Sequence, residues 1–370
     1  MKKDIFIKKL TKLVSFETVT GNVVENSKAL GYVISLLNPK AIIKRVKNNN
    51  AEVLIAGNFK TQSPDTAYLV HMDVVSAKPE EFKLKIKGDK AFGRGASDMK
   101  FSIPMGIALL NEFISNKSKF AFTLAITTDE EHGGDEGCAY LAEKLKFRPK
   151  YLIVPDGGDN LTFVNKSKGV CWLDILSKGS PSHASRPWMG KNALEPLILL
   201  TKKLMDIYGK NSLKENWNTT MNIGQIQGGI SVNQVCPEAV MKLDFRFPES
   251  NTFQKITKEV ADLAKKLSPN IEVKIASSTL PTFTDTNLPV VKNFIGSMEK
   301  AYDKKIIISP AYGASDSSHF APYNIPVLMM KPMGGEIHSA NEWVSISSCL
   351  KFYDGLKIFL KRLESNYGQN

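Results

Sequence analysis

Apolar residues in this chain follow two patterns: short continuous runs, and stretches with an apolar residue every three or four positions. Runs of about four to eight apolar residues are typical of buried strands, and the longer spacing is typical of amphipathic helices. Helices separated by strands in this way indicate an α/β fold with a largely parallel mixed sheet. The runs predict strands at 41–46, 53–56, 67–70, 121–127 and 151–154, with helices at 4–14, 24–37, 101–115 and 136–145.

The pattern changes between residues 167 and 280. A long strand is expected first, then a helix, two strands, a second helix and a last strand. This βαββαβ order is the ferredoxin-like pattern. Residues 281–370 return to helix, strand and loop. The elements expected in the middle segment are strands at 169–177, 219–227, 238–247 and 271–276, and helices at 193–207 and 253–267.

A chain of 370 residues exceeds what one hydrophobic core usually serves, so two domains are expected. No apolar run approaches the length of about 18 residues that a membrane-spanning helix needs. The N-terminal MKKDIFIKKLTKLVSF has its apolar residues interrupted by lysines, which indicates an amphipathic helix rather than a signal peptide. Cytoplasmic residence is therefore expected. The four cysteines show no CxxC spacing, so neither a zinc knuckle nor a disulfide framework is predicted: Cys138, Cys171, Cys236 and Cys349.

The net charge of +12 raises the question of a nucleic-acid partner. The lysines are scattered along the chain, without an Arg-rich block or interleaved aromatic residues. We therefore expect no nucleic acid and no membrane as partner, and keep nucleic-acid binding as a minor alternative that a salt-dependent gel shift would test. A positive field of this kind also attracts anionic small molecules.

Acidic and histidine residues recur at the ends of the predicted strands, or in the glycine-rich loops that follow them. The ends of parallel strands meet at one crevice, so residues far apart in sequence can come together there. Imidazole nitrogens and carboxylate oxygens are ligands that zinc accepts. The residues are His71, Asp73, Asp98, Glu130, Glu131, Asp156 and His338.

His71 and Asp73 lie two apart at the end of the YLVHMDVV run, so their side chains share one face of the strand. A ligating imidazole usually donates its other N–H to a carboxylate, which predicts His71 as a ligand and Asp73 as the residue that orients it. Asp98, in GRGASDMK, precedes a predicted helix. It is either an N-cap or a carboxylate that bridges two metals about 3.5–4 Å apart. For His71 and Asp73, the alternative is a buried histidine beside a turn-forming aspartate.

The AFTLAITT strand ends in three successive acids within TTDEEHGG. Adjacent negative charges repel one another, and a divalent cation would relieve that repulsion. We predict Glu131 as a ligand and Glu130 as the general base, with an exposed acidic turn as the alternative. Asp156 precedes two glycines that let the backbone turn sharply, and a plain Asp-Gly turn is its alternative. His338 completes a set in which each of two metals has two ligands and shares a third.

In this order the strings resemble the dinuclear zinc exopeptidase and deacylase family, across essentially the whole chain. That family includes succinyl-diaminopimelate desuccinylase, acetylornithine deacetylase, aminoacylase, glutamate carboxypeptidase, carnosinase-type dipeptidases and the bacterial tripeptidase. The resemblance implies two Zn²⁺ per subunit, with Co²⁺ or Mn²⁺ as substitutes, and a cis peptide after Asp98. One zinc would be held by His71, Asp98 and Asp156, the other by Asp98, Glu131 and His338, with Glu130 as base and Asp73 supporting His71.

The resemblance also implies the domain plan: a zinc-exopeptidase-like catalytic domain (1–166 plus 281–370) interrupted by an inserted ferredoxin-like lid and dimerisation domain (167–280). In relatives the insertion pairs two subunits, so a homodimer is expected. By the same likeness, His183 in SPSHASRPW stabilises the oxyanion, and Asn233 and Arg246 hold a substrate carboxylate. Gly313 and Ser315 in YGASDSSHF would contact the substrate. The alternatives are loop residues for His183 and Asn233, and a surface ion pair for Arg246.

The substrate class rests on Asp156. The desuccinylase, aminoacylase and glutamate carboxypeptidase branches commonly have glutamate there, whereas aspartate resembles the dipeptidase and tripeptidase branches. We therefore expect a dipeptidase or other exopeptidase of short peptides that uses activated water and a glutamate base. An N-acyl amino-acid deacylase is the alternative, since the compact length and the Asn233/Arg246 pair resemble the deacylase and carboxypeptidase branches. A non-catalytic binding protein on the same fold is a third interpretation.

Overall fold

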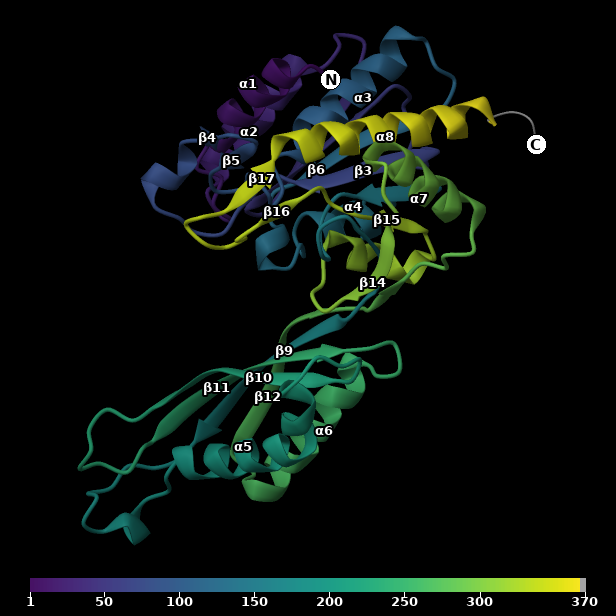
Figure 1. Cartoon of the computed structure of the whole chain (residues 1–370). Coiled ribbons are helices and arrows are strands. Elements are labelled where there is room, and N and C mark those ends of the chain that lie inside the picture. The colour runs from purple at the N-terminus through teal and green to yellow at the C-terminus, as the bar shows by residue number, and fades with distance from the viewer. Residues whose placement is uncertain (367–370) are drawn as a thin grey trace. The chain divides into compact units, whose positions relative to one another are not determined.

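The computed structural model describes residues 1–366, which form two compact units (Figure 1). The main unit comprises Met1–Lys166, Phe283–Ala311 and the chain from Ser315 onward. The inserted unit comprises Ser167–Thr282 and the short segment Tyr312–Ala314. The predicted domain junctions were 166/167 and 280/281. The predicted lid and dimerisation roles of the insertion stay predictions.

The main unit is built on a sheet in the order β1-β2-β6-β3-β7-β15-β8-β13, with β14 paired to β8. Its centre is parallel, since β3 pairs in parallel with β6 and β7, and β15 with β7. The β1–β2, β2–β6 and β8–β15 pairs are antiparallel. The strands are β1 (Ile42–Asn48), β2 (Ala51–Gly57), β3 (Thr66–His71), β6 (Phe122–Thr127), β7 (Tyr151–Val154), β8 (Thr162–Ser167), β13 (Thr282–Phe283), β14 (Ile307–Ala311) and β15 (Val327–Met329).

Both faces of this sheet are covered, which explains why its central strands are continuous apolar runs. Tyr68 and Val70 of β3 belong to the larger core, and Ala67 and Leu69 belong to a second core on the opposite face. The larger core includes residues of α1 (Lys3–Val14), α2 (Val23–Leu36), α3 (Ser102–Ser115), α7 (Pro289–Tyr302) and α8 (Ile346–Ser365). The second includes residues of α4 (Cys138–Glu143) and the 3₁₀ segment η5 (Asp316–Tyr323).

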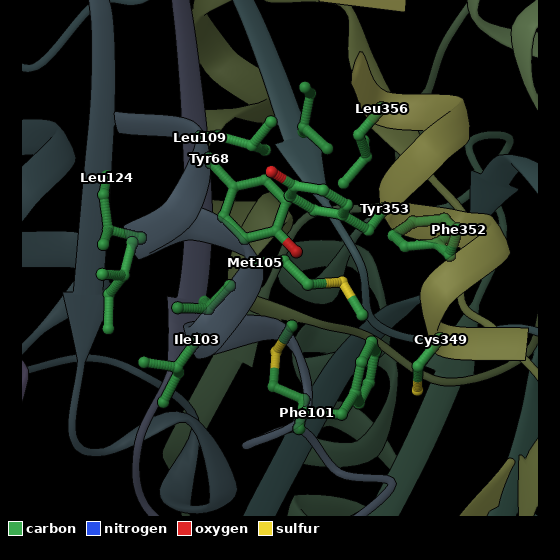
Figure 2. Close-up of a cluster of buried hydrophobic side chains, with 14 of the residues drawn as sticks. Tyr68, Phe101, Ile103, Met105, Leu109, Leu124, Cys349, Phe352, Tyr353 and Leu356 are labelled. Carbon is green, nitrogen blue, oxygen red and sulfur yellow. The ribbon is translucent and has the colours of Figure 1, made fainter. Parts of the chain in front are cut away.

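Figure 2 shows how the larger core is filled. The Tyr68 ring lies among Met105 and Leu109 of α3 and Tyr353 and Leu356 of α8. Burying a large apolar side chain contributes about 1.5–3 kcal/mol. The strands that carry the candidate ligands are therefore held on a rigid, close-packed support.

A small antiparallel sheet, ordered β16-β17-β5-β4, also belongs to the main unit. The β4–β5 hairpin is exposed and rich in lysine, and β16 has only two residues. Neither contains a continuous apolar run, so the hydrophobic pattern did not predict them. The predicted helix 136–145 is shorter in the structure, where α4 spans Cys138–Glu143. The Asp129 carboxylate accepts the N–H groups of Glu136 and Gly137, which lie in the loop before the helix. The strands are β4 (Lys85–Lys87), β5 (Lys90–Phe92), β16 (Gly334–Gly335) and β17 (Trp343–Ser345).

The inserted unit is a four-stranded antiparallel sheet in the order β10-β11-β9-β12. Alternate residues of β9 and β11, such as Leu173 and Leu243, are buried in one core with residues of both helices. The predicted ferredoxin-like order and the mixed α/β class are confirmed. The elements are β9 (Gly169–Lys178), α5 (Leu194–Tyr208), β10 (Thr220–Gly228), β11 (Glu238–Phe247), α6 (Phe253–Leu267) and β12 (Ile271–Thr279). Within residues 1–366, every helix is too short or too polar to cross a membrane.

Candidate metal centre

Three loops with candidate site residues follow neighbouring parallel strands, whereas Asp98 and His338 follow β5 and β16 of the small antiparallel sheet. His71 is the last residue of β3, Glu130 and Glu131 lie in the 3₁₀ turn η2 (Glu130–His132) after β6, and Asp156 follows β7. In the sheet, β3 lies between β6 and β7. Because parallel strands present their carboxyl ends at one edge, the three loops converge there.

Two groups of three side chains meet at this edge. In each group, one ligand atom per residue lies within 4.8 Å of the others. His71 Nε2 is 3.1 Å from Asp98 Oδ1, and His338 Nε2 is 3.3 Å from Asp98 Oδ2 and 3.1 Å from Glu131 Oε2. Asp98 therefore offers one oxygen to each group. The groups are His71, Asp98 and Asp156, and Asp98, Glu131 and His338.

The charges of these side chains fit a pair of divalent cations. Burial and the nearby Asp98 carboxylate raise the pKa of Asp156 to about 6. Burial also raises the pKa of Glu130 well above its usual range, and the charge of Asp156 adds to this. Burying several carboxylates together is costly unless positive charge accompanies them. Two imidazoles and three carboxylates, one of them shared, suit zinc or a similar metal.

Glu130 belongs to neither group but lies beside them. Its Oε2 is 3.9 Å from His71 Nε2, and its side chain is 16% exposed. A carboxylate next to a metal pair, reachable by solvent and not used as a ligand, has the placement expected of a general base. The sequence predicted Glu131 as a ligand and Glu130 as the general base. In the structure, Glu131 belongs to a ligand group and Glu130 does not.

Asp73 contacts both His71 and the acidic loop. His71 Nδ1 is 3.0 Å from the Asp73 carbonyl oxygen and 3.5 Å from its carboxylate. The carboxylate also accepts the backbone N–H groups of Glu130 and Glu131, each at 3.2 Å, and the hydroxyl of Thr20 at 2.8 Å. Burial alone would lower the pKa of His71, but hydrogen bonds with Asp73 and Asp98 raise it well above its usual value.

Asp98 does not cap α3, which begins at Ser102 with Phe101 in the N-cap position. The Asp98–Met99 peptide is cis, as the family resemblance implied. Although burial acts in the opposite direction, hydrogen bonds with His338 and His71 lower the pKa of Asp98. Of the two interpretations drawn from the sequence, the structure excludes the N-cap.

Asn160 and Thr20 are contributors that sequence reasoning missed. Asn160 Nδ2 donates to the Gly334 carbonyl at 2.7 Å, and the Gly334 N–H donates back to Asn160 Oδ1 at 3.0 Å. This pair ties the loop after Asp156 to the segment that leads to His338. An asparagine and a threonine in loops carry no local signal for such contacts.

The inserted unit brings His183 and Asn233 into neighbouring loops. The Ala184 N–H donates to the Asn233 carbonyl at 2.9 Å, and His183 forms a β-bridge with Gln234. Both side chains are exposed, and His183 Nδ1 lies 2.8 Å from the Ser185 hydroxyl oxygen. Their predicted roles toward the substrate stay predictions.

Arg246 is engaged by a carboxylate of its own strand. Its Nε and Nη2 donate to the two oxygens of Asp244 at 2.8 and 2.9 Å. The ion pair that was the alternative for Arg246 is therefore present, and a substrate carboxylate would have to share or replace it. Gly313 lies in the inserted unit's short segment, with open space where a side chain would stand. Ser315 is buried, with its hydroxyl 2.8 Å from that of Ser317.

Comparison with known proteins decides the family. The model of peptidase family M20/M25/M40 matches residues 67–362, which include all five candidate ligands. The chain belongs to this family. It is an enzyme that hydrolyses amide bonds of peptides or acyl amino acids, which sets aside the interpretation as a non-catalytic binding protein.

Relatives within the family differ in what they act on. The chain is 28% identical over 302 residues to a LysW-lysine/LysW-ornithine hydrolase of Sulfurisphaera tokodaii, covering 81% of each chain. It is 24% identical to a succinyl-diaminopimelate desuccinylase of Rickettsia massiliae, covering 97% of this chain and 100% of the relative.

Solved structures share the fold along nearly the whole length. A tripeptidase of Staphylococcus aureus superposes with a TM-score of 0.81 at 20% identity, covering 99% of both chains. A family M20 metallo-carboxypeptidase of Sulfolobus solfataricus superposes with a TM-score of 0.83 at 19% identity, covering 97% of this chain and 99% of the other.

Proposed function

We propose that this protein is a dinuclear zinc exopeptidase that cleaves dipeptides or other short peptides. The observation that carries the proposal is the Asp98 carboxylate, which offers one oxygen to each of two ligand groups, with Glu130 beside them. This is the arrangement that a two-metal hydrolase requires. Aspartate at position 156 supports a short peptide as substrate.

The residues of the chain divide the chemistry between them. Cations held by the two ligand groups would polarise the scissile carbonyl and acidify the attacking water. Glu130 takes the proton as the water attacks and then delivers it to the leaving nitrogen. Asp73 keeps His71 and the Glu130 loop in place, through the contacts described above.

Three residues of the inserted unit complete the proposed mechanism. His183 donates to the oxyanion, a type of interaction that contributes several kcal/mol when it is preorganised. Asn233 and Arg246 hold the substrate carboxylate, for which the planar guanidinium of Arg246 is suited. Gly313 and Ser315 line the substrate in this proposal. Closure of the insertion would exclude water and bring His183, Asn233 and Arg246 to the reacting bond.

A deacylase of N-acyl amino acids is the second candidate. Of the two relatives named above by sequence, one is a desuccinylase by its name, and the other is a hydrolase of LysW-lysine and LysW-ornithine. Such a substrate also offers an amide bond near a free carboxylate, so the same residues would serve it. The two candidates differ in the group on the acyl side of the scissile bond.

One experiment tests the proposal and separates the candidates. The purified chain is analysed for bound metal and assayed with a panel of dipeptides, tripeptides, N-acetyl and N-succinyl amino acids. Two zinc ions per subunit with hydrolysis of dipeptides would support the exopeptidase. Hydrolysis confined to N-acyl amino acids would replace it with the deacylase. Absence of hydrolysis across the panel, after incubation with Zn²⁺, Co²⁺ and Mn²⁺, would overturn both.

We further propose a cytoplasmic homodimer that pairs through the inserted unit. Exposed apolar side chains on α5, among them Ile198, Leu199 and Met205, support a partner surface there. Light scattering of the metal-loaded protein measures the mass directly. A monomeric mass at full activity would overturn the dimer without affecting the proposed chemistry.

A further inference from the structure

Glu342 is a buried carboxylate close to the metal centre that belongs to neither ligand group. It is 1% exposed, and it follows the candidate ligand His338 by four positions. A carboxylate removed from water must be compensated by positive charge and hydrogen bonds, or it destabilises the fold. The partners of Glu342 therefore indicate what it does.

Each of the two carboxylate oxygens of Glu342 accepts two hydrogen bonds from the loop that carries Asp98. Oε1 accepts the backbone N–H groups of Ser97 at 2.8 Å and of Asp98 itself at 3.0 Å. Oε2 accepts the Arg94 guanidinium at 2.9 Å and the Gly95 N–H at 3.0 Å. The main-chain oxygen of Glu342 also accepts the Gly93 N–H at 3.0 Å.

The same residue is fixed in the segment that carries His338. Glu342 directly precedes β17, which pairs with β5 through Trp343 and Phe92. β17 also pairs with β16, so His338 lies in the loop between these two paired strands. One side chain thus joins the loop of the shared ligand Asp98 to the loop of His338.

From these contacts we infer that Glu342 is a positioning residue of the metal centre: it fixes the Asp98 backbone so that each carboxylate oxygen faces one ligand group before any cation binds. The inference rests on the proposed metal centre and adds a residue to it. A residue that holds a ligand in this way typically changes metal affinity by about 10–100-fold when it is replaced.

The test compares Glu342→Gln with Glu81→Gln. Both glutamates pair with Arg94, since Glu81 Oε2 accepts its other nitrogen at 3.2 Å, but the Glu81 carboxylate does not contact the backbone of Ser97 or Asp98. A glutamine at 342 keeps one acceptor oxygen and faces the remaining two donors with an N–H₂ group. Glu81→Gln therefore controls for loss of an Arg94 ion pair, at a carboxylate whose other oxygen accepts the Lys78 N–H.

Zinc affinity is measured for the whole chain by competition with a chromophoric chelator. We expect Glu342→Gln to weaken binding by about 10–100-fold, with Glu81→Gln within about twofold of the wild type. The visible spectrum of the Co²⁺-loaded protein should change in Glu342→Gln only. If wild type and both variants bind two metals equally well, the inference is overturned and the proposed centre stands. If the wild type binds no metal, the proposed function fails instead.

A second measurement on the metal-free wild type keeps the inference testable if Glu342→Gln does not fold. The amides of Gly95, Ser97 and Asp98 should exchange with deuterium slowly, because each donates to the carboxylate of Glu342. If these amides exchange rapidly while the amides of β3 stay protected, the loop is not held in place before a cation binds. That result would overturn the inference.

Discussion

The main unit and the inserted unit present their functional residues in opposite ways. The candidate ligands of the main unit converge from several loops onto one carboxylate. Hydrogen bonds that involve the side chains of Asp73, Asn160 and Glu342 hold those loops. In the inserted unit, His183 and Asn233 are exposed, and Arg246 is occupied by its strand neighbour Asp244. The candidate ligands are thus brought together within one unit, whereas the predicted substrate residues of the inserted unit do not form one cluster there.

This difference indicates where tolerance to change lies. A cation site requires ligand atoms at fixed distances, so the surrounding loops must be rigid. Recognition of a substrate allows a residue to exchange one partner for another when the ligand arrives. Variants of the two units should therefore fail in different ways.

Asp98→Ala should remove both metals and reduce hydrolysis to the uncatalysed level, because this side chain belongs to both ligand groups. Asp156→Ala, which belongs to one group, should retain part of the metal. Metal analysis after gel filtration measures both. Asp135→Ala, an exposed acid in the loop after Glu131, is the matched control and should keep two metals. Equal metal content in Asp98→Ala and Asp156→Ala would break the shared-ligand model.

Glu130→Ala should lower kcat by about 10²–10⁴-fold, the range for loss of a general base, while the metal content stays at the wild-type value. The reason is that Glu130 lies beside the ligand groups without belonging to either. Steady-state kinetics and metal analysis on the same preparation check this. Parallel loss of metal and activity would instead make Glu130 a ligand.

Arg246→Lys should raise KM by about tenfold, or about 1.4 kcal/mol, with a smaller change in kcat and no change in metal content. A lysine cannot form the two parallel hydrogen bonds that a guanidinium offers to a carboxylate. Lys242→Ala is the matched control, since Lys242 is an exposed cation of the same strand in an ion pair with Asp174. The idea fails if both variants leave KM unchanged for a substrate with a free carboxylate.

Tyr208→Phe should cost about 1 kcal/mol of unfolding free energy, because the hydroxyl loses its hydrogen bond to Glu259 while the ring keeps its edge contact with Phe245. The residue lies in the core of the inserted unit, so metal affinity should not change. Urea unfolding with and without zinc measures both quantities. An altered zinc affinity would show that the two units are energetically coupled.

The sequence predicted the elements with strong patterns and the ligands with strand-end positions. β6, β7 and β11 are continuous or alternating apolar runs, and their predicted bounds differ by at most one residue from the structure. The two ligand groups implied by the family resemblance are the ones that the structure brings together. Their identity as zinc ligands stays a prediction.

Other features depend on tertiary contacts that no local pattern records. β16 consists of two glycines, and the β4–β5 hairpin is rich in exposed lysines, so neither shows an apolar period. Glu342 and Asn160 act through hydrogen bonds to residues more than a hundred positions away. The ion pair of Arg246, in contrast, is local. Its partner Asp244 is two positions away on the same strand, so both side chains lie on one face.

The long stretch of the inserted unit, Ser167–Thr282, begins and ends at one place on its own sheet. β9 and β12 are neighbours, with Val170 opposite Thr279, and the hydroxyls of Ser167 and Thr282 are 2.6 Å apart. The chain thus leaves and returns through two adjoining strands. A gene could gain or lose the whole segment between them without moving either end of the break, since a short hairpin turn would rejoin the strands.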